Sequence, residues 1–141
     1  MREVRQQVAD TVTGFFHELG AEIAHYSVEK VVIRLALEQR HLNNASTLHG
    51  GVLATLADVA MAMAGTYVND LHERRVAITL SMNLSFEGVA KAGSTVLATG
   101  YCTTAGHKIF MSRCEIKDTM GTLLAFATGV FKRGALRREL P

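Results

Sequence analysis

The sequence predicts an α+β domain in which a six-stranded antiparallel sheet wraps around one long buried helix. Three observations predict it. The stretch HGGVLATLADVAMAMAGTY (49–67) reads as a helix that is apolar on nearly every side, and such helices are buried. Two strand patterns precede this helix and four follow it. Consecutive strands joined by short turns pair antiparallel, and the apolar face of such a sheet is large enough to cover one helix.

An extra amphipathic helix is predicted at the N-terminus, over residues 1–19. Its apolar side chains recur at helical spacing between polar ones, and Gly20 ends the pattern. These apolar side chains are Val4, Val8, Val12, Phe15, Phe16 and Leu19. Two strands are predicted next, at 21–28 and 31–38, with a short turn between them.

The central helix is predicted over residues 50–68, after a polar, turn-rich loop at 39–48. The strand at 77–86 alternates most clearly, because its apolar side chains recur at every second residue. These side chains are Ile78, Leu80, Met82, Leu84 and Phe86. Three more strands are predicted at 94–103, 108–117 and 122–132. A basic tail then ends the chain with Lys132, Arg133, Arg137 and Arg138.

Composition favours one globular domain over residues 1–141, since 48% of the residues are apolar and 20% are charged. A formal net charge of +2 gives no argument for a nucleic-acid partner.

The first ten residues have no apolar core, so we expect no signal peptide. Cys102 and Cys114 would not lie opposite each other in the predicted hairpin, so we expect free thiols in a reducing cytoplasm. Asp58, inside the apolar stretch, argues against insertion into a membrane.

Gly50 and Gly51 open the central helix. The first amides of a helix have no internal partners and lie at the positive end of the helix dipole. Because glycine has no side chain, a ligand can approach this backbone closely. Such a site suits an oxyanion, as in acyl transfer, where one donor contributes about 2.7–4 kcal/mol. The alternative is that the two glycines only form a tight turn.

Asp58 is the only charged residue between His49 and Asp70. An ionised carboxylate on an apolar helix is costly unless it is paired, hydrogen-bonded or hydrated. Asp58 lies about 12 Å along the helix axis from Gly50, a distance that an Asp side chain does not span. If both groups act on one atom, Asp58 must come from a second chain, and a two-fold dimer would contain two equivalent sites. The alternative is a buried Asp that bonds a neighbouring hydroxyl or backbone amide.

Three further candidates carry weak signals by themselves. His49 either caps the helix or belongs to the site. Asn43 lies in a loop, where Asn is common, and Thr79 lies on a strand, where Thr is common. Other catalytic templates fit poorly, because the sequence has no GxSxG nucleophile elbow and no P-loop. The six histidines show no metal-ligand spacing with the two cysteines, so we predict no metal and no cofactor.

The stretches NNASTLHGGVLATLADVA and TLSMNLSF resemble the hotdog-fold acyl-CoA thioesterases of the phenylacetate-degradation (PaaI) type, and the resemblance covers nearly the whole chain. Its most specific part is a spacing of six residues from Asn43 to His49 and nine from His49 to Asp58, with Gly50 and Gly51 between them. The resemblance implies the hotdog fold, in which the sheet surrounds the long helix. It also implies a homodimer with shared active sites, arranged as a dimer of dimers.

The resemblance further implies a role for each catalytic candidate. The Gly50 amide polarises the thioester carbonyl, and Asp58 of the partner chain is the general base for water or the nucleophile itself. Asn43 holds the attacking water or the substrate carbonyl region. His49 helps to orient the thioester, and Thr79 helps to position the water.

Substrate-binding positions are implied in the same way. The long strand after the central helix lines a pantetheine channel through Met82, Asn83 and Leu84. Gly51 belongs to the backbone that the substrate approaches. Lys108 falls near a Gly-Lys pair that meets CoA phosphates in relatives, and the alternative is a solvated hairpin lysine.

The predicted function is hydrolysis of acyl-CoA to free acid and CoA, with an aryl group of the phenylacetyl or hydroxybenzoyl type or a medium-chain acyl group. The acyl group stays open because Glu87 follows the long strand, where relatives often continue with a basic residue and a proline. The alternative is a non-catalytic hotdog protein that binds or senses acyl-CoA. Asp58 argues against it, because a pure binder needs no carboxylate on its helix. A hotdog dehydratase or hydratase is disfavoured, because HLNNASTLH contains no Asp-x-Asn-Pro-x-His run.

Overall fold

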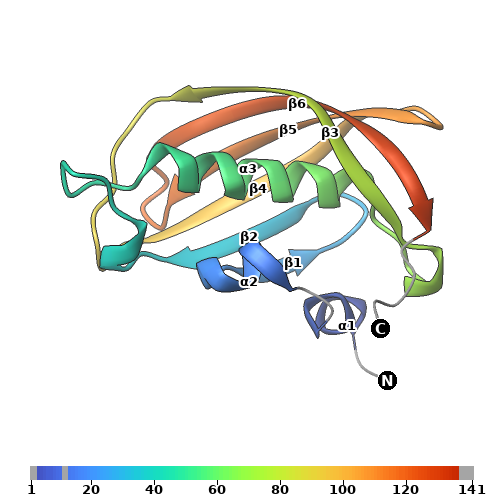
Figure 1. Ribbon diagram of the computed structural model, residues 1–141, viewed down its shortest axis with the longest axis horizontal. Coiled ribbons are helices and arrows are strands. Elements are labelled where there is room, and N and C mark those ends of the chain that lie inside the picture. Colours follow the sequence, from blue (N-terminus) through green and yellow to red (C-terminus); the bar gives the residue numbers. More distant parts are fainter. Residues whose placement is uncertain (1–2, 11–12, 137–141) are drawn as a thin grey trace.

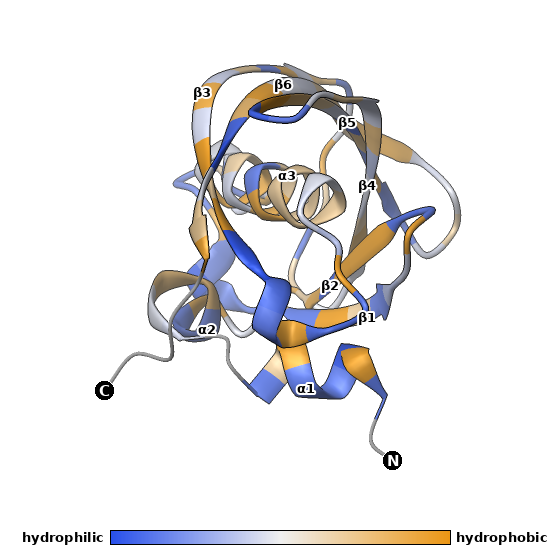
Figure 2. Ribbon diagram, turned by 90° about the vertical axis from the view of Figure 1, so that its right-hand side faces the viewer, coloured by the Kyte–Doolittle hydropathy of each residue, from blue (hydrophilic) through white to orange (hydrophobic). Residues whose placement is uncertain are grey.

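One long helix lies inside a curved antiparallel sheet (Figure 1). The computed structural model describes residues 3–10 and 13–136. Its strands are β1 (Glu22–Tyr26), β2 (Val31–Ala36), β3 (Arg75–Phe86), β4 (Thr95–Ala105), β5 (Ile109–Asp118) and β6 (Leu123–Leu136). They are ordered β1-β2-β4-β5-β6-β3, and helix α3 (Gly50–Gly65) lies against the concave face of the sheet. Figure 2 shows α3 nearly end-on with the sheet curving around it, so the predicted α+β architecture is confirmed.

All six predicted strands are present, and each neighbouring pair is antiparallel. β6 continues past its predicted end because its last residues pair with the first residues of β3. Arg133, which the sequence places in a basic tail, therefore belongs to β6, as does Lys132 at the predicted end of that strand. Arg137 and Arg138 of the predicted tail lie outside the described residues.

Two short helices, α1 (Val4–Asp10) and α2 (Gly14–Leu19), occupy the stretch where the sequence predicts one helix over 1–19. Gly14 has a positive φ of 71°, a left-handed conformation that a continuous α-helix does not contain. Four residues of the predicted helix, among them Val12, lie outside the described residues. The described part of this stretch therefore contains two helices where the sequence predicts one.

The central helix ends at Gly65, before its predicted end at residue 68. The Gly65 carbonyl accepts a 2.7 Å hydrogen bond from Arg133 Nη2, which satisfies one of the free carbonyls at the helix end. The Phe110 ring packs directly on Gly65, so a Cβ at this position would lie 1.9 Å from the ring. Two residues that are distant in the sequence therefore contact the last residue of the helix.

Only one side of α3 is buried, although the sequence predicts a helix that is buried all round. The buried side packs on β4 and β5, where Gly100 touches the Ala60 carbonyl and Ser112 Oγ donates to the Met61 carbonyl at 3.0 Å. The opposite side, termed the open side of α3, is half-buried and consists of Val52, Thr55, Asp58, Val59, Ala62 and Thr66. In the described residues no helix is both long and apolar enough to cross a membrane.

Strand β3 contains a bulge that breaks its predicted alternation. Thr79 pairs with Phe131 and Ser81 pairs with Val130, so β3 has one residue more than β6 at this point. Side chains alternate between the two faces of a regular strand. Because of the extra residue, Thr79 and Met82 both face α3 although they are three positions apart.

Three exposed apolar residues of β3 lie before and within the bulge, and a fourth, Phe86, lies at the end of the strand. Val76, Ile78 and Leu80 are 45%, 48% and 53% exposed, whereas Met82 and Leu84 pack against the core. The predicted apolar face that joins Ile78 and Leu80 to Met82 is therefore wrong, since the bulge puts the two groups in different environments. Among the described strands β3 has a neighbour on one side only, and an apolar free edge is a surface on which chains can pair.

Candidate active site

Asp58 on α3 and Thr79 on β3 meet at the open side of the helix. Thr79 Oγ1 donates a hydrogen bond to Asp58 Oδ1 at 2.6 Å. Hydrogen bonds to an ionised carboxylate are short and about twice as strong as neutral ones. Of the alternatives for Asp58, the structure shows the bond to a neighbouring hydroxyl, and that hydroxyl belongs to another predicted site residue.

The second carboxylate oxygen of Asp58, Oδ2, has no hydrogen-bond partner among the described residues. Every buried side-chain nitrogen or oxygen in that part of the chain has a hydrogen-bond partner. Because Oδ2 has none, it is not buried and is accessible to solvent. An accessible carboxylate oxygen can take a proton from water or attack a carbonyl carbon. The arrangement therefore suits Asp58 for base or nucleophile chemistry.

The start of α3 leaves one backbone amide without a partner. His49 is the N-cap residue, and its Nδ1 accepts a 2.8 Å hydrogen bond from the Gly51 N–H. The N–H groups of Val52 and Leu53 bond the His49 carbonyl. The Gly50 N–H has no partner among the described residues and lies at the positive end of the helix dipole. His49 is thus a helix cap, and Gly50 rather than Gly51 has an available donor.

Phe86, at the end of β3, lies over Gly50. A Cβ at Gly50 would lie 3.2 Å from Phe86 Cε1, so a larger residue would displace the ring. Asp58 lies two helical turns further on, about 12 Å along the axis. The Gly50 amide and the Asp58 carboxylate are therefore not brought together within one chain.

Asn43 uses its side chain inside its own loop. Its Oδ1 accepts hydrogen bonds from the N–H groups of Ala45 at 2.9 Å and Thr47 at 3.2 Å. Its Nδ2 donates to Thr47 Oγ1 at 3.1 Å. These bonds shape the loop that leads into α3. One N–H of the carboxamide is left over, and its role toward water or substrate stays a prediction.

The predicted substrate-binding side chains do not lie on one surface. Met82 and Leu84 pack against the core on the α3 side of β3, and Asn83 between them is exposed on the other face. Lys108 is exposed in the β4–β5 hairpin, and its carbonyl accepts a 2.7 Å hydrogen bond from the Arg133 N–H. Because Arg133 also bonds the last carbonyl of α3, this hairpin lies at the opposite end of the helix from the available amide.

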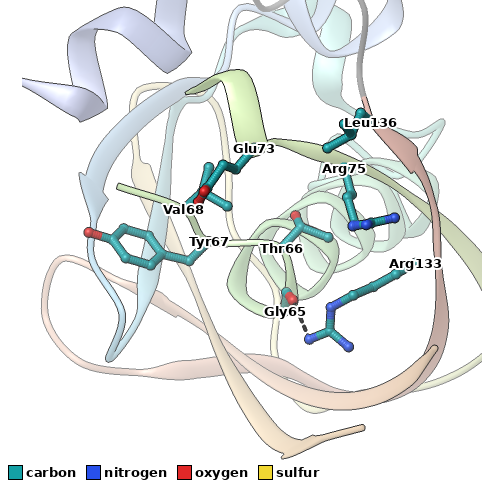
Figure 3. A pocket seen from close by; sticks show the side chains of 8 residues that line it. All are labelled: Gly65, Thr66, Tyr67, Val68, Glu73, Arg75, Arg133 and Leu136. Atoms are coloured by element: carbon teal, nitrogen blue, oxygen red, sulfur yellow. Dashed lines mark hydrogen bonds between the residues drawn. The ribbon is translucent and has the colours of Figure 1, made fainter. Parts of the chain in front are cut away.

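A pocket of about 410 Å³ at the C-terminal end of α3 is not predicted from the sequence (Figure 3). The end of α3, the segment 66–68 that follows it, the 3₁₀-helix η2 (Leu71–Glu73), the start of β3 and the end of β6 form it. Arg75 and Arg133 both line it. No local signal points to Arg133, because the sequence pattern places it in a tail.

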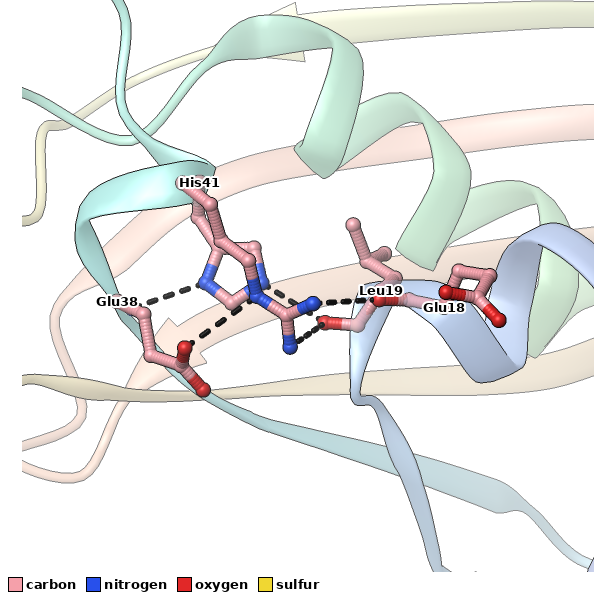
Figure 4. Close-up of polar contacts among 5 residues, drawn as sticks. Glu18, Leu19, Glu38 and His41 are labelled. Atoms are coloured by element: carbon pink, nitrogen blue, oxygen red, sulfur yellow. Dashed lines mark hydrogen bonds and ion pairs between the residues drawn. The ribbon is translucent and has the colours of Figure 1, made fainter.

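His41, to which the sequence assigns no role, anchors the loop before α3 (Figure 4). Its side chain is buried, with Nε2 donating to the Leu19 carbonyl at 2.8 Å and Nδ1 accepting from the Glu38 N–H at 2.9 Å. One donor and one acceptor nitrogen define a neutral imidazole. The His41 carbonyl accepts a 2.9 Å bond from the His49 N–H. The 3₁₀-helix η1 (Gln39–His41) thus ties α2 to the start of α3.

Comparison with known proteins identifies the family. A family model described as the thioesterase superfamily matches residues 45–125, more than half of the chain. The chain is 28% identical over 127 residues to acyl-coenzyme A thioesterase 13 of Mus musculus, covering 89% of this chain and 88% of that protein. It is 29% identical over 102 residues to a putative esterase of Pseudomonas aeruginosa, covering 72% of this chain and 74% of that protein.

A solved structure with the same architecture is that of a mutant of the phenylacetic acid degradation protein PaaI from Thermus thermophilus. It superimposes with a TM-score of 0.74 at 28% identity, covering 85% of this chain and 98% of that chain. The hotdog fold expected from the sequence is therefore confirmed. The chain belongs to the thioesterase superfamily and is a thioester hydrolase with the hotdog fold of PaaI-like proteins.

Proposed function

We propose that this thioester hydrolase cleaves acyl-CoA to a free acid and CoA, with an aryl group of the phenylacetyl or hydroxybenzoyl type or a medium-chain acyl group. The hydrogen bond between Thr79 and Asp58 on the open side of α3 carries the proposal. It orients a carboxylate whose other oxygen is accessible. The names of two relatives support the substrate class, since one is an acyl-coenzyme A thioesterase and the other a phenylacetic acid degradation protein.

Asp58 is the base or the nucleophile of the proposed reaction. As a base, its Oδ2 takes a proton from water while the water oxygen attacks the thioester carbonyl carbon. The tetrahedral intermediate then breaks its C–S bond, and the sulfur leaves as the CoA thiol when it takes up the proton. As a nucleophile, Oδ2 attacks the carbonyl carbon itself, and the C–S bond breaks to release the CoA thiolate and leave a mixed anhydride with Asp58. Water then hydrolyses the anhydride to the free acid and the Asp58 carboxylate, and the proton released in this step converts the thiolate to the CoA thiol. In both cases Thr79 holds the carboxylate through Oδ1, and its oxygen can accept a hydrogen bond from the water.

The amide that polarises the carbonyl comes from a second chain in this proposal. Within one chain the Gly50 N–H lies about 12 Å from Asp58 along the helix axis. The half-buried open side of α3 and the exposed apolar edge of β3 offer a surface for a second chain. A two-fold homodimer through this surface brings Gly50 of the partner subunit to Asp58 and forms two equivalent sites. Two such dimers assemble into a tetramer.

The remaining predicted residues take supporting positions in this arrangement. Met82 and Leu84 face α3 and line the path of the pantetheine arm, whereas Asn83 is exposed on the other face of β3. The spare N–H of Asn43 and the Nε2 of His49 remain available to a ligand. The free thiols are in keeping with a cytoplasmic location.

The test is a thioesterase screen of the purified protein. The substrates are acyl-CoAs from acetyl to palmitoyl together with phenylacetyl-, benzoyl- and hydroxybenzoyl-CoA, and release of the CoA thiol is the signal. We expect Asp58→Asn to lower kcat at least ~100-fold without changing the fold. The matched control is Glu29→Gln, which changes an exposed carboxylate in the β1–β2 turn. Tight acyl-CoA binding without hydrolysis of any thioester would overturn the proposal in favour of a non-catalytic acyl-CoA binding protein.

A further inference from the structure

We propose that the pocket at the C-terminal end of α3 is an anion subsite, which binds a carboxylate or phosphate group carried by the thioester substrate. This inference rests on the proposed function and adds to it a second point of attachment for the substrate. The pocket has a volume of about 410 Å³, enough for such a group. Its charged side chains are Arg75, Arg133 and Glu73 (Figure 3).

The guanidinium group of Arg133 is held rigidly at the pocket wall. It donates to the Gly65 carbonyl at 2.7 Å and to the Gly106 carbonyl of the β4–β5 hairpin. It also lies over the Phe110 ring, with Cζ 4.6 Å from the ring centroid. These contacts are with neutral groups, so they fix the position of the charge without neutralising it.

Arg75 places a second guanidinium at the same pocket. Its side chain is exposed, and its Nη1 donates to the Gly134 carbonyl at 3.1 Å. A guanidinium has five N–H donors in a fixed plane, so most of its hydrogen-bonding capacity remains. Arginine is the side chain best suited to bind planar carboxylates and phosphates through two parallel hydrogen bonds.

The charge at the pocket is unbalanced. Among the described residues no ion pair within 4.0 Å joins Arg75 or Arg133 to a carboxylate. Glu73 is the one acidic residue that lines the pocket, against two guanidinium cations. The excess positive charge in a concave site favours an anionic ligand.

The pocket and Asp58 lie on the same side of α3. Asp58, Ala62 and Thr66 follow one another at intervals of four residues, which places them in one row along the open side of the helix. Thr66, at the pocket, is about 12 Å along the axis from Asp58. On β3, Arg75 is about 13 Å along the strand from Thr79. A substrate with its carbonyl at Asp58 therefore reaches the pocket with a group carried roughly 12 Å away.

Two parts of a thioester carry anionic groups at such a distance. One is a carboxylate at the far end of a medium-length acyl chain, which extends from Thr79 in the direction opposite to the pantetheine path along Met82 and Leu84. The other is the phosphate groups of CoA, which reach the pocket only if the pantetheine arm runs toward Arg75 instead of along Met82 and Leu84. Both present negatively charged oxygens to the guanidinium groups of Arg75 and Arg133. The test therefore uses probes that carry one of these groups at a time.

The experiment measures binding by calorimetry, with thioester probes studied in the Asp58→Asn background so that they stay intact. The probes are CoA, pantetheine without phosphates, octanoyl-CoA, and the eight-carbon acyl-CoA that ends in a carboxylate. The affinity for each probe is measured for the protein with Arg75 intact, for Arg75→Gln and for Arg75→Lys, which keeps the positive charge. Arg34→Gln is the matched control, because Arg34 is a partly exposed arginine on β2.

We expect Arg75→Gln to weaken binding of the anionic probe about tenfold, and Arg75→Lys to stay within about threefold. Weaker binding of CoA with unchanged pantetheine assigns the subsite to the phosphates. Weaker binding of the carboxylate-ended thioester with unchanged octanoyl-CoA assigns it to the acyl chain. Unchanged binding of every probe in Arg75→Gln would overturn the subsite. The calorimetric measurement of binding does not depend on hydrolysis. Absence of hydrolysis would therefore count against the proposed function without deciding whether the anion subsite exists.

Discussion

Thr79 donates a 2.6 Å hydrogen bond to Asp58, which joins the edge strand of the sheet to the open side of the central helix. The contact exists because the bulge in β3 adds one residue between Thr79 and Ser81. In a regular strand, residues three positions apart lie on opposite faces. Without the bulge, a strand with Met82 against the helix would therefore point Thr79 away from the helix. The bulge therefore positions the hydroxyl that orients the carboxylate.

Replacing Thr79 by valine tests whether this hydrogen bond is used in catalysis. Thr79→Val keeps the size of the side chain and removes a hydrogen bond to a charged group, which is worth about 1.5–3 kcal/mol. We expect kcat to fall about 10- to 100-fold with a smaller change in KM. Thr79→Ser keeps the hydroxyl and is expected to stay within about threefold of the wild type. Equal kcat values for the valine and serine variants would show that the hydroxyl has no catalytic role.

Replacing Gly50 by proline tests the role of its amide. Proline lacks the N–H, fits the first position of a helix, and needs an extended residue before it. His49 meets this need, with φ −66° and ψ 133°. We expect Gly50→Pro to lower kcat by about 100- to 1,000-fold, the usual effect of losing an oxyanion donor.

The control for this substitution is Gly50→Ala. It adds a Cβ near the Phe86 ring but keeps the N–H, and the ring is 58% exposed and free to shift. We expect its kcat to stay within about fivefold of the wild type. If the alanine and proline variants lose the same activity, the loss comes from crowding and not from the amide.

The buried His41 makes a prediction for stability. His41→Phe leaves the Glu38 N–H and the Leu19 carbonyl without their partner, at about 1–3 kcal/mol for each buried group. We expect the free energy of unfolding, measured by urea denaturation, to fall by about 2–4 kcal/mol. The matched control is Arg40→Gln, in which an exposed side chain loses its bonds to the Glu18 and Leu19 carbonyls and its ion pair with Glu38, and we expect less than about 1 kcal/mol there. An unchanged free energy of unfolding in His41→Phe would contradict the anchoring role.

The two cysteines are both free, as the sequence predicts, and Cys114 gives a prediction on pH. Burial raises the pKa of the Cys114 thiol from its ordinary value of 9.0 to about 12. Between these values the unfolded chain releases a proton that the folded chain keeps. The free energy of unfolding therefore falls as the pH rises, by about 1.4 kcal/mol per pH unit.

The measurement is denaturation at pH 8 and pH 10, with Cys114→Ala as the reference. Other groups that titrate in this range affect both proteins alike. We expect the wild type to lose about 1.4 kcal/mol more than Cys114→Ala between the two pH values. Equal losses would mean that the folded thiol ionises as readily as the unfolded one.

Much of the fold is predictable from the sequence because its signals are local. The periods of 3.6 and two residues identify α3 and all six strands, and turns between strands predict antiparallel pairing. The contacts at the end of α3 are not local, because Phe110 and Arg133 reach Gly65 from distant strands. The bulge at Thr79 is not local either, because it arises from the register between β3 and β6.

Some residues of the candidate site can be recognised from the local sequence, and others are brought together only by the fold. The spacing from Asn43 through Gly50 to Asp58 can be recognised in the sequence, because these residues lie on one loop and one helix. The hydrogen bond of Asp58 with Thr79 depends on how the helix crosses the sheet. The pocket with Arg133 is missed, because β6 extends beyond its apolar pattern only by pairing with β3.

The most direct measurement asks whether Asp58 of one chain and Gly50 of another act on the same thioester. Asp58→Asn and Gly50→Pro are mixed as unfolded chains, refolded together, and assayed beside each variant alone. If the sites are shared, every mixed dimer has one site with both native residues, and random assembly restores about one quarter of the wild-type activity. If both residues act within one chain, no mixed dimer contains an intact site, and the mixture stays as inactive as its parents.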